Sequence, residues 1–296
     1  MLKDKYIEYI TFEKRFSPHT IVAYSADLKE FSDYLNFQYT CNSPETADYL
    51  MIRSWLVYLF ENHLTARSIN RKLSALKSFY RFCTIQGAIG MNPMVKVVAP
   101  RNVDKLPLFL SKENIHKLFD VVDFGTGYEA ARDRTILLLF YATGIRRAEL
   151  TNLNLLNVDF EKGTIKVMGK RSKERIIPLG PSVVTELKSY LIVRDTFLAN
   201  KKNNTDAFFV TSKGKSPYPE FIYGIVHKYL KLIASNQKLS PHILRHTFAT
   251  HMLDDGADLN AIKELLGHSS LAATQVYTHN TIEKLKTIYK QAHPRA

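Results

Sequence analysis

The sequence is poor in cysteine and contains no long apolar run. Cys41 and Cys83 are its only two cysteines among 296 residues, which excludes a disulfide framework and a cysteine-based zinc site and fits a reducing cytosol. The most apolar stretch, Ile136–Ala142, is far too short to cross a bilayer. The N-terminus carries acids and lacks the apolar core of a signal peptide. We therefore expect a cytoplasmic protein without a membrane segment.

Acidic residues are also in short supply. Lys and Arg number 41 against 28 Asp and Glu, a formal net charge of +13. This excess predicts a polyanionic partner, with nucleic acid ahead of an anionic membrane. Hydrophobic residues make up 45% of the chain, as in folded soluble proteins, so disorder is not expected to dominate. A length of 296 residues is close to the limit of a single hydrophobic core, and it predicts two domains.

The basic charge begins in the middle of the first hundred residues. Residues 1–50 hold five basic and eight acidic side chains, whereas residues 51–101 hold eight basic ones and one acid, Glu61. The segment Ala66–Cys83 has the periodicity of an amphipathic helix. Its apolar side holds Ile69, Leu73, Leu76, Tyr80 and Cys83, and its polar side holds Arg67, Arg71, Ser74, Ser78 and Arg81.

A basic stripe of this kind can reach successive phosphates along a DNA groove. A solvated helix face with ordinary basic decoration would have the same pattern. Because this face lacks acids, we favour DNA. The predicted DNA contacts are Arg67, Arg71, Lys77 and Arg81.

The chain divides into three parts by composition. We expect a helical domain over 1–91, an extended linker over 92–108 that contains three prolines, and a second domain over 109–296. In the first domain, capping residues and apolar spacing predict helices over 19–35, after Ser43-Pro44, over 52–62 and over 66–83.

The second domain is predicted to be mainly helical with a small antiparallel sheet. Helices are expected over 115–122, 129–143, 181–198, 220–234, 241–254 and 259–266, and from Thr281 onward. Three short segments with β-like composition, 158–160, 164–168 and 175–179, lie beside glycine turns. They predict two or three strands.

Five features of the second domain carry side chains suited to one kind of chemistry. They are the helix break Thr143-Gly144-Ile145-Arg146, the hairpin lysine Lys170, the pair His242 and Arg245 on one helix face, the dipeptide Gly267-His268, and Tyr277. Arginine can donate two hydrogen bonds at once to phosphate oxygens, tyrosine can be a covalent nucleophile, and lysine and histidine can transfer protons. Each feature alone has an ordinary structural explanation. Their joint order and spacing favour phosphoryl transfer.

Two other kinds of site fit the sequence poorly. A phosphate-binding P-loop needs four residues between its glycines, but five separate Gly163 from Gly169, and Arg171 replaces the required Ser or Thr. The helix that carries His242 and His246 lacks a His-Glu-x-x-His motif and a nearby acidic ligand. A zinc site is therefore not expected.

The same motifs resemble the tyrosine recombinase (integrase) family, and most strongly its Xer subgroup. The resemblance rests on Leu239–His251, Gly256–Leu259, Leu265–Ser269, Thr274–His279 and His293–Ala296, and it extends over nearly the whole chain. It implies a two-domain, C-shaped clamp in which a helical core-binding domain and an α+β catalytic domain grip DNA from two sides. It also implies site-specific recombination, of the kind that resolves chromosome dimers.

The resemblance implies a role for each residue of the set. Arg146 and Arg245 would clamp the scissile phosphate, Lys170 would protonate the 5′-oxygen, His242 would act as a base or proton shuttle, His268 would hydrogen-bond a phosphate oxygen, and Tyr277 would attack phosphorus to form a 3′-phosphotyrosyl link. Glu149 is expected to orient an active-site neighbour. The basic hairpin Lys170–Arg175, including Arg171, is expected to contact the DNA backbone as well. Because the ester stores the bond energy, neither a metal nor another cofactor is implied.

The partners implied are double-stranded DNA with paired recombination sites and a tetramer, formed by identical subunits or with a related recombinase. Activation by a DNA translocase is compatible with this. The C-terminal helix Thr281–Gln291 is expected to dock on a neighbouring subunit. Three alternatives stay open: an integrase of a mobile element, a type IB topoisomerase, and a DNA-binding protein without chemistry. The complete set of catalytic residue types disfavours the last, since binding alone needs no tyrosine at position 277.

Overall fold

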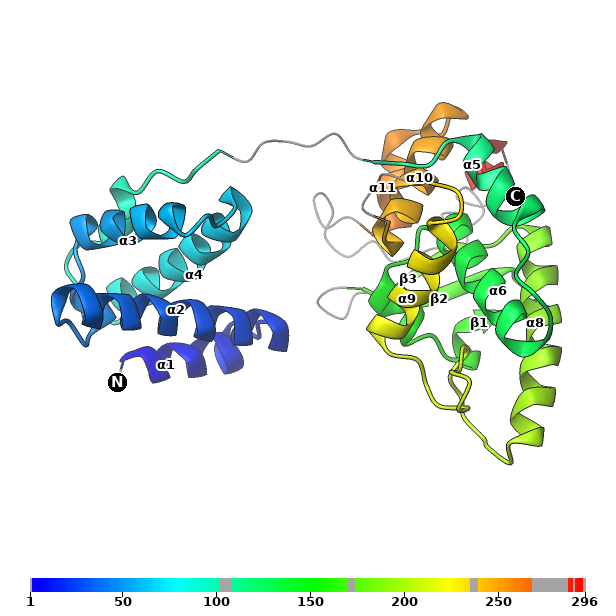
Figure 1. The fold of residues 1–296 in the computed structure, drawn as a ribbon, viewed down its shortest axis with the longest axis horizontal. Helices are drawn as coiled ribbons and strands as arrows, with labels where there is room; N and C mark the ends of the chain where they lie inside the picture. The colour runs from blue at the N-terminus through cyan, green and yellow to red at the C-terminus, as the bar shows by residue number, and fades with distance from the viewer. Residues whose placement is uncertain are drawn as a thin grey trace. The chain divides into compact units, whose positions relative to one another are not determined.

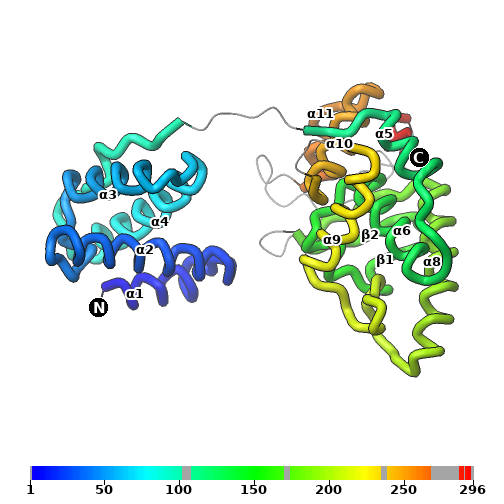
Figure 2. The backbone as a smooth tube through the Cα atoms, in the orientation of Figure 1, coloured from blue at the N-terminus to red at the C-terminus, as the bar shows by residue number. Residues whose placement is uncertain are grey.

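The computed structural model describes residues 2–101, 108–169, 174–234, 239–267, 287–289 and 291–294. The chain divides into two compact units, Met1–Lys105 and Leu106–Ala296. Figures 1 and 2 draw the first unit in blue to cyan and the second in green to red. Each unit has a hydrophobic core of its own, so each is described by itself.

In its described residues, the first unit is built from four α-helices. They are α1 (Leu2–Glu8), α2 (Pro18–Tyr39), α3 (Tyr49–Glu61) and α4 (Ala66–Ile85), with a π-helical turn at Tyr9–Glu13. Side-chain caps fix where the longer helices begin, because an oxygen of Ser17, Asp48 or Thr65 accepts a backbone N–H in the first turn. Aromatic side chains fill the core, where the ring centroids of Phe31 and Trp55 lie 4.8 Å apart.

The structure differs from the prediction at the start of α3. The helix expected after Ser43-Pro44 is only a 3-10 turn, Pro44–Thr46. The following helix, α3, begins at Tyr49 and not at residue 52, because the side chain of Asp48 accepts the backbone N–H of Met51 at 2.8 Å. A strong cap thus moves the helix start toward the N-terminus.

The expected linker 92–108 also differs in its first part. Pro93–Lys96 forms a 3-10 turn, and Met94 and Val97 are buried in the core of the first unit. The side-chain amide of Asn70 donates to the carbonyl of Pro100 at 2.9 Å, which ties this segment to α4. The proline-based expectation of an extended chain is wrong here, since proline also fits the first position of a helical turn.

The second unit packs its helices around α6. Its described helices include α5 (Lys112–His116), α6 (Gly127–Thr143), α7 (Arg147–Thr151), α8 (Pro181–Asn200), α9 (Pro219–Leu230), α10 (Pro241–Asp254) and α11 (Leu259–Leu266). The apolar α6 is buried along most of its length and packs against α8, α9 and α10. The helix predicted over 115–122 is instead α5 followed by a π-helical turn, Lys117–Val121, whereas α10 and α11 have the predicted bounds.

A small sheet completes the second unit. Its strands β1 (Val158–Asp159), β2 (Thr164–Met168) and β3 (Glu174–Pro178) are antiparallel in the order β1-β2-β3. The predicted fold class, mainly helical with a small antiparallel sheet, is confirmed. None of the described helices is long and apolar enough to cross a membrane.

The register of the sheet brings an arginine into the interior. Val167 lies opposite Arg175, and Ile165 lies opposite Ile177. All four side chains are buried, which places them on the inward face of the two strands. Arg175 is therefore a core-facing residue of β3.

Residues near the C-terminus pack on their own chain. Tyr289 and Ala292 are buried in a small cluster with Phe248 and Leu265 of α10 and α11. The ring of the buried His293 stacks on that of Tyr289, with 4.8 Å between centroids. The described part of the helix expected to dock on a neighbouring subunit thus lies against its own unit, and the rest of that helix lies outside the described residues.

Candidate active site

Arg146 lies at a sharp junction between two helices. The first helix, α6, ends at Thr143 with Gly144 as its C-cap, at a left-handed φ of 57°, and Arg146 is the N-cap of α7. A Cβ on Gly144 would come within 2.6 Å of Phe248 and 2.7 Å of Leu266. Only glycine lets the chain turn this closely past α10 and α11. The junction therefore fixes the backbone of Arg146, as the helix break in the sequence indicates.

Glu149 holds both the backbone and the side chain of Arg146. Its Oε2 accepts from the backbone N–H of Arg146 at 2.8 Å, and its Oε1 accepts from Nη1 of the same residue at 2.8 Å. The first contact is the return half of a helix capping box, with the acid at the third helical position. This is the geometry that an orienting carboxylate requires.

Arg245 reaches the same place from α10. Its Nη1 donates to the carbonyl of Gly144, and its Nη2 donates to the carbonyl of Leu266 at 2.6 Å. Nη2 of Arg146 donates to the carbonyl of Gly267 at 2.7 Å. The two arginines predicted to clamp a phosphate thus meet at the C-terminal end of α11, where the free carbonyls attract cations.

Arg175 is a third arginine of this cluster, although the sequence alone places it in a basic, DNA-contacting hairpin. It donates from Nη1 and Nη2 to the two oxygens of Glu149 at 2.5 and 2.8 Å, and from Nε to the carbonyl of Leu265 at 2.9 Å. Its side chain is 4% exposed. The expectation that Arg175 contacts the DNA backbone is therefore wrong. A usable signal was the alternation in β3, which puts Arg175 on the same face as the apolar Ile177.

The described cluster combines three guanidinium groups with the carboxylate of Glu149. Burial alone would raise the pKa of Glu149, but the hydrogen bonds and charges of Arg175 and then Arg146 outweigh it and lower that pKa. Burial, followed by the charges of Arg146 and Arg175, lowers the pKa of Arg245 to about 9, so Arg245 stays cationic at neutral pH. Two positive charges in excess therefore remain for an anionic ligand.

His242 lies one turn before Arg245 on α10, with part of its surface exposed and part covered by protein. Partial burial, together with the positive charges of His246, Arg245 and Arg147, lowers the pKa of His242. The imidazole is therefore neutral at neutral pH, which is the form that accepts a proton. Within the part of the chain that the structure describes, no three His, Cys, Asp or Glu side chains gather as a metal site would need.

Four of the predicted site residues lie outside the described residues, namely Lys170, Arg171, His268 and Tyr277. The segment with the first two joins Met168 to Glu174, which pair across β2 and β3. Gly267 immediately precedes the third. Arg175, two residues after the first undescribed segment, belongs to the arginine cluster, and Gly267, immediately before the second, accepts a hydrogen bond from Arg146.

The predicted DNA contacts of the first unit lie on one exposed stripe of α4, formed by Arg67, Arg71, Lys77 and Arg81, with the apolar side buried. The neighbouring helix α2 adds acids that the sequence of α4 does not reveal. Buried Asp27 pairs with Arg71 and, at 3.3 Å, with Lys72, and Glu30 pairs with Lys72 at 2.5 Å. The ion pair with Asp27 thus holds one guanidinium nitrogen of Arg71, while 46% of the Arg71 side chain stays exposed.

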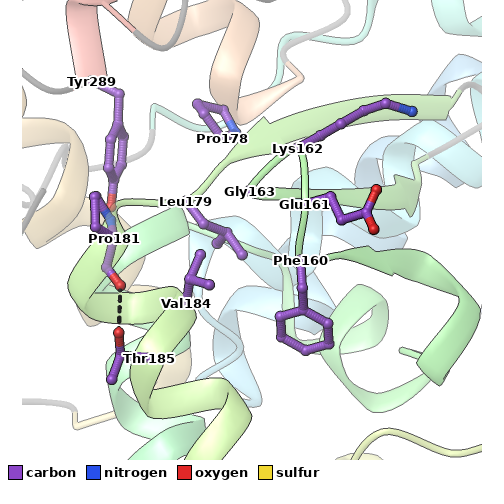
Figure 3. A pocket seen from close by; sticks show the side chains of 10 residues that line it. All are labelled: Phe160, Glu161, Lys162, Gly163, Pro178, Leu179, Pro181, Val184, Thr185 and Tyr289. Carbon is purple, nitrogen blue, oxygen red and sulfur yellow. Dashed lines mark hydrogen bonds between the residues drawn. The ribbon is translucent and has the colours of Figure 1, made fainter.

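The second unit also has hollows on its surface. Figure 3 shows one between the β1–β2 turn, the end of β3 and the start of α8, with Tyr289 on one side. Its volume is about 380 Å³, and no predicted site residue lines it. A second hollow of about 290 Å³ is lined in part by Glu149 and Lys166. The hollow in Figure 3 is therefore separate from the arginine cluster, in which the predicted site residues Arg146 and Arg245 lie.

Comparison with known proteins covers the whole chain. Residues 108–284 match the phage integrase family, and residues 4–87 match the phage integrase N-terminal SAM-like domain. The chain is 40% identical over 294 residues to the tyrosine recombinase XerC of Oceanobacillus iheyensis, across 99% of this chain and 96% of that one. It is 36% identical over 295 residues to the tyrosine recombinase XerC of Staphylococcus aureus, across 100% and 97%.

Solved structures share the fold. The XerH site-specific recombinase in its post-cleavage complex with a palindromic difH substrate gives a TM-score of 0.69 at 23% identity, over 93% of this chain and 76% of that one. A lambda integrase fragment, seen as a dimer bound to a core site, gives a TM-score of 0.68 at 17% identity, over 93% and 98%.

The fold, the arginine cluster and these matches together define the class: the chain belongs to the phage integrase family of tyrosine recombinases, which are enzymes of DNA strand exchange. Its full-length relatives named above are XerC proteins. The chain is a site-specific recombinase of this Xer type, which confirms the resemblance in its motifs.

Proposed function

We propose that this protein cuts and rejoins DNA through a 3′-phosphotyrosyl intermediate and that its role is to resolve chromosome dimers. The observation that carries the proposal is the meeting of Arg146 and Arg245 at the end of α11, with Arg146 held by Glu149. Two fixed guanidinium groups supply the donors that the non-bridging oxygens of a phosphodiester need. The XerC relatives support the chromosomal role.

The proposed reaction conserves the energy of the phosphodiester. The phenol oxygen of Tyr277 attacks phosphorus, the 3′-phosphate becomes esterified to it, and the 5′-oxygen leaves as a hydroxyl with a proton from Lys170. His242 takes or relays the phenol proton, and His268 donates to a phosphate oxygen. A 5′-hydroxyl from the partner strand then attacks the ester and releases the tyrosine.

The DNA backbone is proposed to lie along the exposed stripe of α4 and beside the hairpin that contains Arg171. Contacts from Arg67, Arg71, Lys77 and Arg81 would position the duplex without reading its sequence. The catalytic unit would hold the other side of the same duplex, as a clamp. This division leaves sequence readout to side chains that reach base edges.

The proposed assembly is a tetramer on two DNA sites, formed by identical subunits or together with a related recombinase, in the cytoplasm. The palindromic substrate of the XerH complex and the dimer of the lambda integrase complex support two subunits for each site. Two such sites brought together require four subunits. A DNA translocase is the proposed activator.

Covalent capture tests the proposal. The protein is incubated with nicked suicide duplexes made from fragmented host chromosome, denatured in SDS, and the trapped DNA is sequenced, with Tyr277→Phe as the control. We expect an adduct with the natural protein only, and DNA from a single chromosomal site.

Three other results would overturn parts of the proposal. Trapped DNA from the ends of a mobile element would make the protein an integrase of that element. Adducts on many unrelated duplexes, without strand exchange, would indicate a topoisomerase. Tight binding without any adduct, even after cell extract is added, would indicate a DNA-binding protein without chemistry.

A further inference from the structure

Arg175 is enclosed by protein more completely than the other arginines of the cluster. Its side chain is 4% exposed, against 25% for that of Arg146. All three of its nitrogens donate to protein oxygens, at distances of 2.5 to 2.9 Å. A guanidinium held in this way does not reach a DNA phosphate. Its charge and hydrogen bonds act on neighbouring protein groups.

The end of α11 is one of those neighbours. Three consecutive carbonyls there accept hydrogen bonds from three different arginines: Leu265 from Arg175, Leu266 from Arg245 and Gly267 from Arg146. The last carbonyls of a helix have no partner within it and carry partial negative charge, so cations hold them strongly. The chain continues from this point to His268 and, nine residues later, to Tyr277.

Glu149 is the other neighbour. Arg175 donates to both of its oxygens, and each oxygen also accepts from Arg146. Because Arg175 holds both carboxylate oxygens of Glu149, the carboxylate has a fixed orientation, and so do its hydrogen bonds to Arg146. In addition, Gly267 packs closely on Arg175: a Cβ added to Gly267 would lie 3.0 Å from Cδ of Arg175.

We propose that Arg175 is a positioning residue of the recombination reaction. It holds Glu149 against Arg146, and it fixes the helix end from which the chain runs to His268 and Tyr277. It is also the second residue of β3, the strand that follows Lys170 in the sequence. The inference rests on the proposed function of the site. It requires that loss of Arg175 slows phosphoryl transfer without weakening DNA binding.

The chain offers a matched control in Arg194 of α8. This side chain is 3% exposed, pairs with Asp195 at 2.5 Å, and donates to the carbonyls of Thr205 and Ala207 at 2.7 Å. Like Arg175 it is a buried arginine with one carboxylate partner and backbone partners, but none of these partners belongs to the arginine cluster. Asp195 is 67% exposed whereas Glu149 is 3% exposed, so Arg194→Lys is a control for changing a buried guanidinium, and the urea unfolding of each variant accounts for the remaining difference in stability.

Single-turnover cleavage of a saturating suicide duplex measures the step in question. We expect Arg175→Lys to slow adduct formation about 10- to 100-fold, as for other residues that orient active-site groups, with the Kd for DNA and its salt dependence within twofold of the natural protein. Arg194→Lys should keep the natural rate. Urea unfolding of each variant verifies that the rates refer to folded protein, and Arg175→Gln serves as a second variant.

A double-mutant cycle tests whether Arg175 acts through Glu149. Combining Arg175→Lys with Glu149→Gln should cost little more than the slower single change, whereas Arg194→Lys combined with Glu149→Gln should be additive. Equal rates for Arg175→Lys and the natural protein would overturn the inference, as would a loss of DNA affinity that accounts for the slower reaction. If the natural protein itself forms no adduct, the proposed function fails, and that result is separate from either outcome.

Discussion

Arg146 and Glu149 are joined by two hydrogen bonds of 2.8 Å, one from the backbone and one from the guanidinium of the arginine. The carboxylate of Glu149 therefore caps the first turn of α7 and also fixes the direction of the Arg146 guanidinium. The chain needs Gly144 immediately before this junction. The glycine turn, the predicted active-site arginine and the carboxylate that caps α7 thus depend on one another, and all three lie between Gly144 and Glu149.

Glu149→Gln should destabilise the protein by about 3 kcal/mol, because removing one partner of a buried ion pair leaves the other charge uncompensated. The guanidinium of Arg175 would lose its anionic partner, while the amide keeps a single accepting oxygen. Urea unfolding monitored by circular dichroism measures this. A loss below about 1 kcal/mol, the range of exposed ion pairs, would contradict the burial of this pair.

The stability contribution of Glu149 should depend on pH. Its pKa is lower in the folded protein than in the unfolded chain, so the contribution is complete above the unfolded pKa of about 4.3 and is lost as pH falls through the folded value. The difference in unfolding free energy between the natural protein and Glu149→Gln should thus be constant at neutral pH and shrink below about pH 4. A difference that grows on acidification would contradict the sign of the shift.

Gly144→Ala should destabilise the second unit by about 3 kcal/mol, from a left-handed backbone and a Cβ pressed on two packed side chains. Those side chains are Phe248 and Leu266, at 2.6 and 2.7 Å from the added atom. Gly224→Ala is the control, since it lies inside α9 and an added Cβ there would meet no atom within 4 Å beyond its chain neighbours and the backbone of its own helix. That change should stabilise by about 0.5 kcal/mol through helix propensity. Thermal unfolding of the two variants side by side tests the contrast.

Arg71→Ala and Arg81→Ala should each reduce the salt dependence of DNA binding by about one unit of slope, and together by about two. Both lie on the exposed stripe of α4. Fluorescence anisotropy at several salt concentrations gives the slope. If neither change alters it, the stripe does not meet DNA. If only Arg81→Ala alters it, Asp27 keeps Arg71 from the phosphates.

The arrangement along the chain was largely predictable from the sequence, because glycines, prolines and capping residues are local signals. The start of α10 follows from Ser240-Pro241 in this way, and the three strands follow from β-like segments beside glycine turns. The errors are local too. Met94 and Val97, in and just after the turn Pro93–Lys96, are buried in the core of the first unit. The sequence predicted an extended linker there because composition does not show where a proline-rich segment packs.

Long-range pairing explains what the sequence could not reveal in the site. Arg175 finds Glu149 from 26 residues away and Leu265 from 90 residues away. In the sequence it is one basic residue of a basic hairpin, and only the alternation in β3 separates it from its neighbours. Asp27 likewise reaches Arg71 from another helix, 44 residues earlier. The catalytic roles stay predictions from the motifs, for Arg146, His242 and Arg245 as well as for Lys170, His268 and Tyr277.

The identity of the nucleophile is the central claim, and mass spectrometry of the covalent adduct tests it most directly. The adduct is trapped on a suicide duplex and digested with trypsin and a nuclease. The peptide that spans residues 264–284 contains a single tyrosine, Tyr277. We predict a nucleotide joined to that tyrosine through its 3′-phosphate, with a free 5′-hydroxyl on the released strand. A linkage to serine or to another tyrosine, or a 5′-phosphate on the protein, would contradict the proposed mechanism.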